Sequence, residues 1–299
     1  MMPSFIIDFG AKGIWLAFFH SISAFCNAGF DIMGANSGEF SSLTAYSGNP
    51  VISITIMLLI IVGGIGFLVW DDVLKHKFRF SKYKTQSKLV LIVSLGLILV
   101  PAIYLFFFEY ASLPFGERVL VSLFQAVTPR TAGFNTANLT SLSQIGLVIF
   151  IILMLIGGSP GSTAGGMKTT TFAVVFASMI AVFKKKEDAE LLKRRVDDQT
   201  VENAYAIFTL YLTLFLLSAM IISAIEGLPL ESCLFETASA IGTVGLTLGI
   251  TPYLSVASKI ILMVLMYFGR VGGLTLIYAT LGGKKSQVSK LPVDKITVG

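Results

Sequence analysis

The chain has 299 residues, of which 55% are hydrophobic and 13% are charged, and its mean hydropathy is +0.82. This composition leaves too little polar surface to cover one soluble core of this size, so it excludes a soluble globular domain and predicts an integral membrane protein. The net charge of +5 does not indicate a nucleic-acid partner, because the basic residues are concentrated in polar segments between apolar runs.

Five apolar runs follow one another along the chain. Four of them, residues 51–70, 89–108, 205–225 and 256–281, approach or exceed the roughly 20 residues that a helix needs to cross a bilayer. The fifth, residues 145–183, is nearly twice as long, and a glycine-rich stretch interrupts it. That stretch predicts a non-helical loop between two helical pieces, and it consists of Gly157, Gly158, Ser159, Pro160, Gly161, Ser162, Thr163, Ala164, Gly165 and Gly166.

Three half-length apolar segments, residues 14–25, 117–127 and 231–241, each precede a short glycine motif. The three copies of the motif are Asn27-Ala28-Gly29-Phe30, Thr131-Ala132-Gly133-Phe134 and Thr243-Val244-Gly245-Leu246. Their glycines recur at intervals of 104 and 112 residues, and a full-length apolar run follows each copy. The recurrence predicts repeats of one structural unit. A single copy would be typical of an ordinary turn.

The basic residues predict the topology. Sixteen of the 22 Lys and Arg residues lie in three polar segments, which the positive-inside rule places in the cytoplasm. They are Lys75, Lys77, Arg79, Lys82, Lys84 and Lys88, then Lys184, Lys185, Lys186, Lys193, Arg194 and Arg195, then Lys284, Lys285, Lys290 and Lys295. The opposite connections are acidic and hold a single Arg118. We therefore expect a multi-pass plasma-membrane protein whose C-terminal tail is cytoplasmic.

If each half-length segment enters the membrane and returns to the same side, successive motifs lie on one face, as parallel repeats. Inverted repeats would place them on opposite faces. The carboxyl end of each half-helix then points toward the membrane centre and carries a partial negative charge, which favours a cation. Glycine at the repeated position allows backbone carbonyls to face one axis, as in ion filters.

These motifs, the broken helix and Gly269-Arg270-Val271-Gly272-Gly273 resemble the Ktr/Trk/HKT superfamily of potassium transporters, and most closely the membrane subunit of the bacterial Ktr system. The resemblance implies an all-α membrane fold of parallel span–pore-loop–span repeats around a pseudo-symmetric cation pore. By register, residues 1–80 would be a second repeat lacking its first span, residues 81–196 the third, residues 197–283 the fourth, and residues 284–299 a cytoplasmic tail. The family pore has four units, so the resemblance also implies that the first unit is missing from this sequence.

The resemblance assigns roles to individual residues. The selectivity filter for K⁺ would consist of Gly29, Gly133 and Gly245 with the carbonyls of Asn27, Ala28, Thr131, Ala132, Thr243 and Val244. Residues 157–166 would form an intramembrane gate, and Arg270 would face it. An arginine in a span costs about 2.5–3.5 kcal/mol on insertion scales, so it should find acceptors; snorkelling to the cytoplasmic end is the alternative.

The resemblance further implies a homodimer in the bilayer on a cytoplasmic nucleotide-binding ring, no cofactor in this chain, and Na⁺ as an activator. Two other functions fit the composition: a secondary transporter with broken helices, and a membrane enzyme or assembly factor. No catalytic constellation supports an enzyme, and His20 and His76 lack partners at metal-ligand spacing.

Three positively charged or glycine-rich features need separate interpretation. Residues 161–169 resemble a phosphate-binding loop, but Met167 separates Gly166 from Lys168 and breaks the required spacing. Lys168 is expected to begin the second helical piece or to place positive charge under the pore. Arg130 is expected to be either a surface anchor near the pore mouth or a counter-ion to Glu117.

Overall fold

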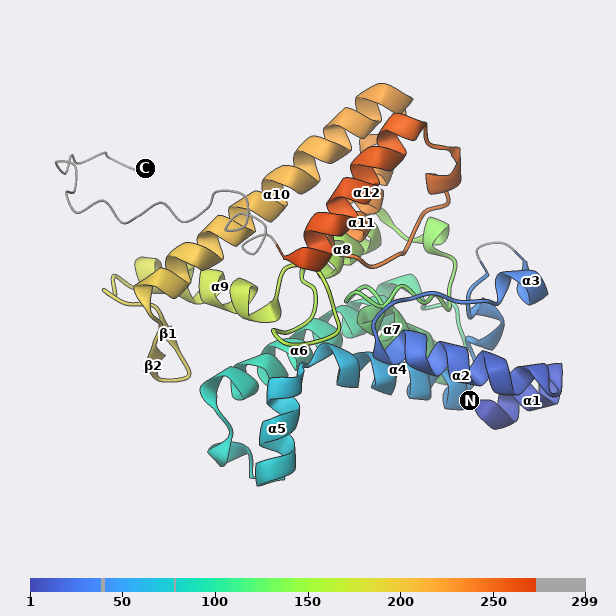
Figure 1. The fold of residues 1–299 in the computed structure, drawn as a ribbon, viewed down its shortest axis with the longest axis horizontal. Helices are drawn as coiled ribbons and strands as arrows, with labels where there is room; N and C mark the ends of the chain where they lie inside the picture. Colours follow the sequence, from blue (N-terminus) through green and yellow to red (C-terminus); the bar gives the residue numbers. More distant parts are fainter. Residues whose placement is uncertain (39–40, 78, 273–299) are drawn as a thin grey trace.

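The computed structural model describes residues 1–38, 41–77 and 79–272, and these are mostly helical (Figure 1). The α-helices of these ranges are α1 (Met2–Phe9), α2 (Lys12–Phe25), α3 (Gly34–Ser37), α4 (Pro50–Gly64), α5 (Phe67–His76), α6 (Thr85–Tyr104), α7 (Phe115–Val127), α8 (Gln144–Leu155), α9 (Thr169–Phe183), α10 (Asp198–Glu226), α11 (Leu230–Ile241) and α12 (Val256–Val271). A two-stranded antiparallel hairpin, β1 (Glu190–Leu191) and β2 (Arg194–Arg195), joins α9 to α10. The predicted all-α class is confirmed.

The longest apolar helices are suited to crossing a bilayer. In the described part of the chain, α10 and the continuous helical segment Thr85–Glu109, which contains α6, are long and apolar enough to span a membrane. The bent pair α4 and α5 passes the same test when taken as one span, and α8 and α9 are shorter apolar helices. Large side chains such as Val100 and Phe107 remain exposed on α6 and its extension, as expected of a surface that faces lipid.

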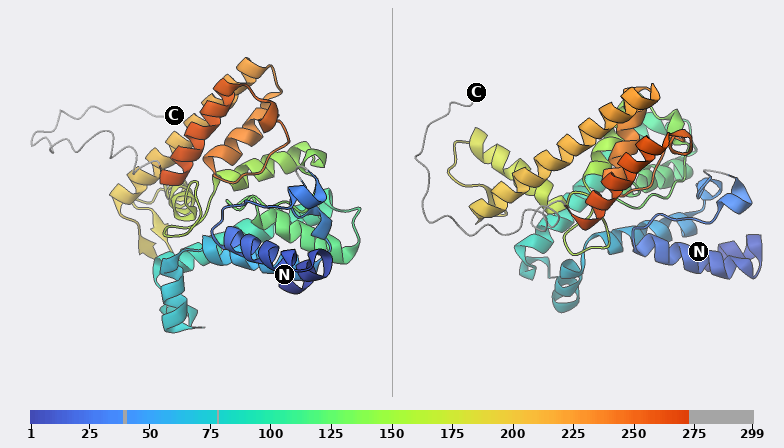
Figure 2. Two further views of the ribbon diagram at one scale, coloured as in Figure 1. Left: turned by 45° about the vertical axis from the view of Figure 1, so that its right-hand side comes forward. Right: turned by 45° about the horizontal axis from the view of Figure 1, so that its top comes forward.

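The helices repeat in order. A long helix, a half-helix and a second helix follow one another in α6–α7–α8 and again in α10–α11–α12, while α2 and α4 repeat the last two elements. The half-helix α7 packs against α4 and α6, and α11 packs against α8, α10 and α12. Figures 1 and 2 show α10, α11 and α12 as one group beside the group formed by α1, α2, α4 and α7. One buried core contains side chains of α7, α8, α10, α11 and α12. A second core contains side chains of α2, α4 and α7.

Each complete unit is closed by a glutamate at the end of its long helix. Glu109 accepts a hydrogen bond of 3.0 Å from the backbone N–H of Ser143, and Glu226 accepts one of 2.9 Å from that of Ser255. Ser143 and Ser255 are the N-caps of α8 and α12. An equivalent glutamate therefore fixes the start of the second helix in each unit, where backbone N–H groups otherwise lack partners.

The apolar run over residues 51–70, predicted as one span, is bent. Helix α4 ends at Gly64, α5 begins at Phe67, and the two axes differ in direction by 99°. Gly66 between them has φ +90°, and a Cβ there would lie 2.5 Å from the carbonyl oxygen of Pro160. The chain turns at a position that only glycine occupies without strain, because residues 157–166 pack into the bend.

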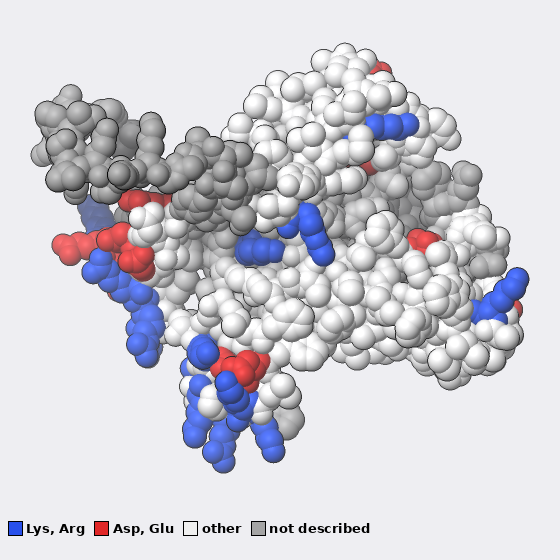
Figure 3. Space-filling model, in the orientation of Figure 1, with Lys and Arg blue, Asp and Glu red and all other residues white. Residues whose placement is uncertain are grey.

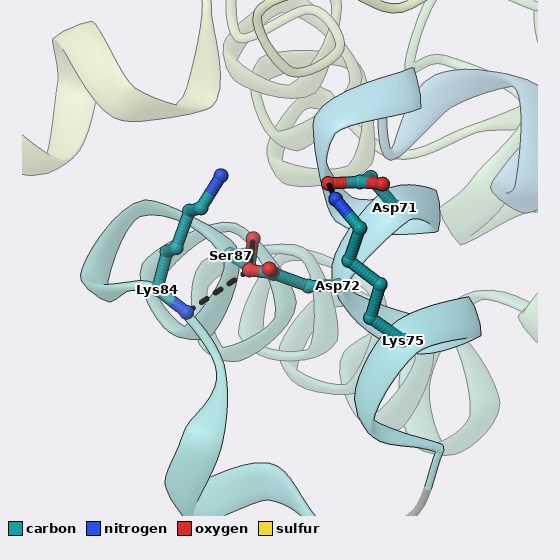
Figure 4. A network of polar contacts seen from close by, with 5 residues as sticks. All are labelled: Asp71, Asp72, Lys75, Lys84 and Ser87. Atoms are coloured by element: carbon teal, nitrogen blue, oxygen red, sulfur yellow. Dashed lines mark hydrogen bonds and ion pairs between the residues drawn. The ribbon is translucent and has the colours of Figure 1, made fainter.

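Helix α5 and the basic segment 79–84 that follows it form an arm that projects from the helical body (Figure 1). Asp72 accepts hydrogen bonds from the Lys84 backbone N–H (2.9 Å) and the Ser87 hydroxyl (2.6 Å), which fixes α5 to the start of α6 (Figure 4). The Ser87 hydrogen bond holds the pKa of the Asp72 carboxyl below its usual range. Asp71 forms an exposed ion pair with Lys75. Figure 3 shows Lys and Arg side chains gathered over this arm and over the β1–β2 hairpin.

The last predicted span is only partly described. Helix α12 ends at Val271, and Gly272 has φ +89°. The predicted continuation to residue 281, and the tail over residues 284–299, lie outside the described residues.

Candidate cation filter and intramembrane loop

The three glycine motifs have the same backbone conformation. The first residue of each copy has a positive φ (Asn27 +49°, Thr131 +67°, Thr243 +52°), and so does the glycine (Gly29 +72°, Gly133 +82°, Gly245 +91°). A positive φ is unfavourable for a β-branched residue such as threonine. The recurrence of this unusual conformation at three places shows that the motifs are structural equivalents.

Each motif folds back onto the end of its own half-helix. The backbone N–H of Ala28 donates to the Ser23 carbonyl (2.9 Å), and that of Val244 donates to the Ser239 carbonyl (2.8 Å). In the second copy, Ala132 donates to the Thr128 carbonyl at 3.0 Å. The half-helices α2, α7 and α11 thus end within a few residues of the motifs, where helix carbonyls provide partial negative charge.

Neighbouring copies are in close contact through their glycines. A Cβ on Gly29 would lie 2.1 Å from the carbonyl oxygen of Ala132, and a Cβ on Gly133 would lie 2.1 Å from that of Val244. Residues with a side chain are therefore excluded at both positions by contact as well as by φ. A Cβ on Gly245 would have no described atom within 4 Å.

The three motif glycines line a cavity of about 150 Å³. Gly29, Gly133 and Gly245 all contribute to it, and Asp31 is the one ionisable side chain among its described lining residues. Sequence reasoning missed Asp31, although it follows the first motif directly. A carboxylate in this cavity favours cations over anions.

The first residue of each copy carries a side-chain polar atom that has no partner among the described residues. These atoms are Asn27 Nδ2, Thr131 Oγ1 and Thr243 Oγ1. Buried polar groups are usually paired, and exceptions concentrate where a ligand or water belongs. Hydroxyl oxygens such as Thr131 Oγ1 and Thr243 Oγ1 are among the groups that bind hard cations.

The intramembrane loop, residues 157–166, joins α8 to α9 as predicted and lies against the first and third copies. The Thr163 hydroxyl is within 3.0 Å of both the Phe25 carbonyl and Asn27 Oδ1. A Cβ on Gly165 would lie 2.0 Å from Thr243 Oγ1. The loop is thus in direct contact with the first residues of two motifs.

The same loop is hydrogen-bonded to three helices that are distant from it in the sequence. Ser159 N–H donates to the Gly64 carbonyl at 3.0 Å, and Gly166 N–H donates to the Gly269 carbonyl at 3.1 Å. The Phe67 N–H at the start of α5 donates to the Gly161 carbonyl at 2.9 Å. The loop therefore contacts α4, α5 and α12 at once.

Two cationic side chains hold consecutive carbonyls of the loop. Arg270 Nη1 donates to the Thr163 carbonyl at 2.8 Å, and Lys168 Nζ donates to the Ala164 carbonyl at 2.7 Å. Lys168 is also the N-cap residue of α9. Arg270 thus lies against the loop that the resemblance placed opposite it, while its side chain remains exposed on one side.

Both expectations for Arg130 are wrong. Its side chain is buried, with 7% of its surface exposed, and Nη2 donates to the Ser94 hydroxyl of α6 at 3.1 Å. Glu117 instead accepts from the Ser47 hydroxyl at 2.7 Å. The burial of Arg130 depends on how α6 packs against α7, a long-range contact that no local pattern in the sequence reveals.

The ring of motifs is open between the third and first copies. A cavity of about 410 Å³ lies there; its lining is Asn27, Ala28, Phe30, Ser239, Thr243, Val244, Gly245, Met266 and Arg270. The residue after the motif glycine shows the same asymmetry: Phe134 and Leu246 are 0% and 3% exposed, whereas Phe30 is 72% exposed.

No cluster of three or more His, Cys, Asp or Glu residues that could hold a metal occurs in the described ranges. Cys26 and Cys233 are free thiols. His20 is buried on α2, where Nδ1 lies 2.7 Å from the Leu16 carbonyl.

Comparison with known proteins agrees with this architecture. Residues 4–285 match the TrkH family, described as cation transport proteins. The chain is 40% identical to the potassium/sodium uptake protein NtpJ of Enterococcus hirae, over 99% of this chain and 66% of that protein. It is 37% identical to the Ktr system potassium uptake protein B of Bacillus subtilis, over 97% of this chain and 64% of that protein.

Among solved structures, the potassium transporter TrkH from Vibrio parahaemolyticus shares the fold. The TM-score is 0.73 at 21% sequence identity, with 89% of this chain and 58% of that chain covered. The chain spans about two thirds of the length of the curated relatives named above. On the family match over nearly its whole length, this chain belongs to the TrkH family of cation transport proteins, as a membrane subunit of the Ktr/Trk superfamily.

Proposed function

We propose that this chain is a subunit of a channel-like K⁺ uptake transporter of the plasma membrane, in which backbone carbonyls of the repeated motifs replace the hydration shell of the ion. One observation carries the proposal. Three motifs share a strained conformation, and neighbouring glycines and carbonyls approach so closely that only glycine fits at the first two junctions. Potassium uptake by the relatives named above supports K⁺ as the substrate.

The intramembrane loop is the proposed gate. It contacts the first residues of two motifs, and Arg270 and Lys168 hold two of its carbonyls. These carbonyls would otherwise attract a cation on the cytoplasmic side of the filter. Release of the loop would open the path.

A fourth unit completes the filter in this proposal. The side between the third and first copies exposes filter atoms and Phe30, and unsatisfied backbone is not tolerated against lipid. We call the protein with its fourth unit present the assembled transporter, whether that unit lies on the same polypeptide or another. A coding sequence upstream of Met1 that contains another span, half-helix and glycine motif would supply it.

The partners proposed are a second copy of the transporter and a cytoplasmic nucleotide-binding ring, and Na⁺ is the proposed activator. The arm that begins with α5 suits such regulation, because the first residue of α5 is hydrogen-bonded to the loop through the Phe67 N–H. Basic loops and the C-terminal tail would face the cytoplasm.

Gly245→Ser tests the filter. A serine must adopt φ +91°, so we expect the carbonyls beside it to shift and the K⁺/Na⁺ flux ratio of the assembled transporter to fall about tenfold or more. The measurement is Rb⁺ and Na⁺ uptake in cells that lack their own K⁺ uptake systems. An unchanged ratio at normal protein abundance would show that the filter assignment is wrong.

A further inference from the structure

Each half-helix carries a pair of polar residues, three positions apart, just before its glycine motif. The first residue is His, Gln or Glu, and the second is Ser or Thr. The pairs are His20 and Ser23 on α2, Gln125 and Thr128 at the end of α7, and Glu236 and Ser239 on α11. All six residues are at most 6% exposed. Polar side chains so deeply buried in an apolar protein need partners.

The second member of each pair contacts the end of its motif. Ser23 and Thr128 donate their hydroxyls to the carbonyls of Phe30 and Phe134, at 2.7 and 2.5 Å. In the third copy, the hydroxyl of Ser239 accepts from the Gly245 N–H at 3.1 Å. This member therefore links the half-helix to the motif in all three units.

The first member differs from copy to copy, and Glu236 makes the largest number of contacts with its loop. Its Oε1 accepts from the Thr247 hydroxyl (2.6 Å) and the Leu248 N–H (3.0 Å), and its Oε2 accepts from the Thr251 hydroxyl (2.5 Å). Thr247 in turn accepts from the Gly249 N–H at 2.9 Å. One buried carboxylate thus organises the five residues that follow the third motif.

Gln125 does the same with fewer contacts. Its amide Nε2 donates to Asn135 Oδ1 at 2.8 Å, and Asn135 receives the Leu43 N–H of the first unit on its backbone carbonyl at 2.8 Å. Gln125 Oε1 has no partner among the described residues.

His20 makes no hydrogen bond to the segment after its motif within the part of the chain that is described. Its Nδ1 contacts its own helix, and its Nε2 is buried without a described partner. The series from Glu236 to Gln125 to His20 therefore runs from a fully braced segment to an unbraced one.

We propose that Glu236 is a positioning residue for ion selection: it holds the segment after Gly245 against α11 and thereby fixes the carbonyls of the third motif. This inference rests on the proposed function of the motifs as a filter. Three donors from this segment converge on the one carboxyl group of Glu236, so the segment resists the displacement that a passing cation imposes. A filter that relaxes loses the fixed oxygen positions on which discrimination depends.

Glu236→Gln is the central test, because glutamine keeps the shape but offers one acceptor oxygen in place of two. The readout is the K⁺/Na⁺ uptake ratio of the assembled transporter, with protein abundance measured alongside. We expect the ratio to fall about three- to tenfold while abundance stays near normal, as expected for the loss of one or two buried hydrogen bonds. Glu231→Gln, an exposed glutamate in the first turn of the same helix, is the matched control and should leave the ratio unchanged.

Thr251→Val removes the donor and leaves the carboxylate in place. We expect it to reproduce part of the loss, and the double variant Glu236→Gln/Thr251→Val to be no worse than the more severe single variant, because Thr251 acts through Glu236. This arm also keeps the proposal testable where Glu236→Gln fails to fold.

An unchanged ratio in both single variants at normal abundance, with Gly245→Ser still impaired, would overturn the role of Glu236 and leave the filter intact. Proportional loss of K⁺ and Na⁺ uptake with abundance would also overturn it, because it would show a role in stability alone. An unchanged ratio in Gly245→Ser as well would instead reject the proposed filter.

Discussion

The two junctions between successive motifs differ sharply from the open side of the ring. At the junctions, Gly29 and Gly133 each face a carbonyl of the next copy, and Phe134 and Leu246 are buried. On the open side, Gly245 faces no described atom and Phe30 is 72% exposed. Glycine is therefore required at the first two positions by contact and by φ, but at the third by φ alone.

The largest expected effect is a difference in stability between equivalent phenylalanines. Phe134→Ala leaves a cavity in a closed junction, so we expect it to cost about 3–5 kcal/mol, whereas Phe30→Ala should lie within about 0.5 kcal/mol of the parent chain. The measurement is the unfolding midpoint of the purified chain in one detergent. In the assembled transporter, Phe30→Ala should become costly as well, because the fourth unit would cover it.

Equal losses from both substitutions in the isolated chain would contradict the comparison. Such a result would mean that Phe30 is already buried and that the open side is closed by some other contact.

The sequence was sufficient to predict the parts of the fold that depend on local pattern. The half-helices follow from the length of the apolar segments, and the structure has α2, α7 and α11 there. The break between α8 and α9 follows from the glycine content of residues 157–166. The bend after Gly64 was not predicted, because Gly63, Gly64 and Gly66 lie inside an apolar run of spanning length. What bends the chain is residues 157–166 packing against Gly66, and that contact is distant in sequence.

The site shows the same limit. The motif residues could be predicted because they recur, and their roles remain a proposal. Glu236 lies inside the predicted half-length segment 231–241 and was given no role, whereas the structure buries it against Thr247 and Thr251. The pairing of a polar residue with Ser or Thr three positions later is the signal that would have found it.

A smaller effect is expected at Arg270, which lines the open side and holds the loop. Arg270→Ala removes one charge-assisted hydrogen bond to Thr163, discounted to about 1 kcal/mol because the side chain is exposed. We expect K⁺ uptake by the assembled transporter to rise about fivefold with an unchanged K⁺/Na⁺ ratio. Abolished uptake in well-folded protein, or an altered ratio, would show that Arg270 does not act on a gate.

The most direct test of the central claim is the position of a bound ion. The assembled transporter should be crystallised with Rb⁺, and the anomalous signal of rubidium should be located relative to the three motifs. We predict peaks on the axis bounded by Gly29, Gly133 and Gly245, with motif carbonyls as ligands, and their loss on exchange for Na⁺. Well-ordered motifs with no rubidium between them, or rubidium bound only elsewhere, would contradict the account.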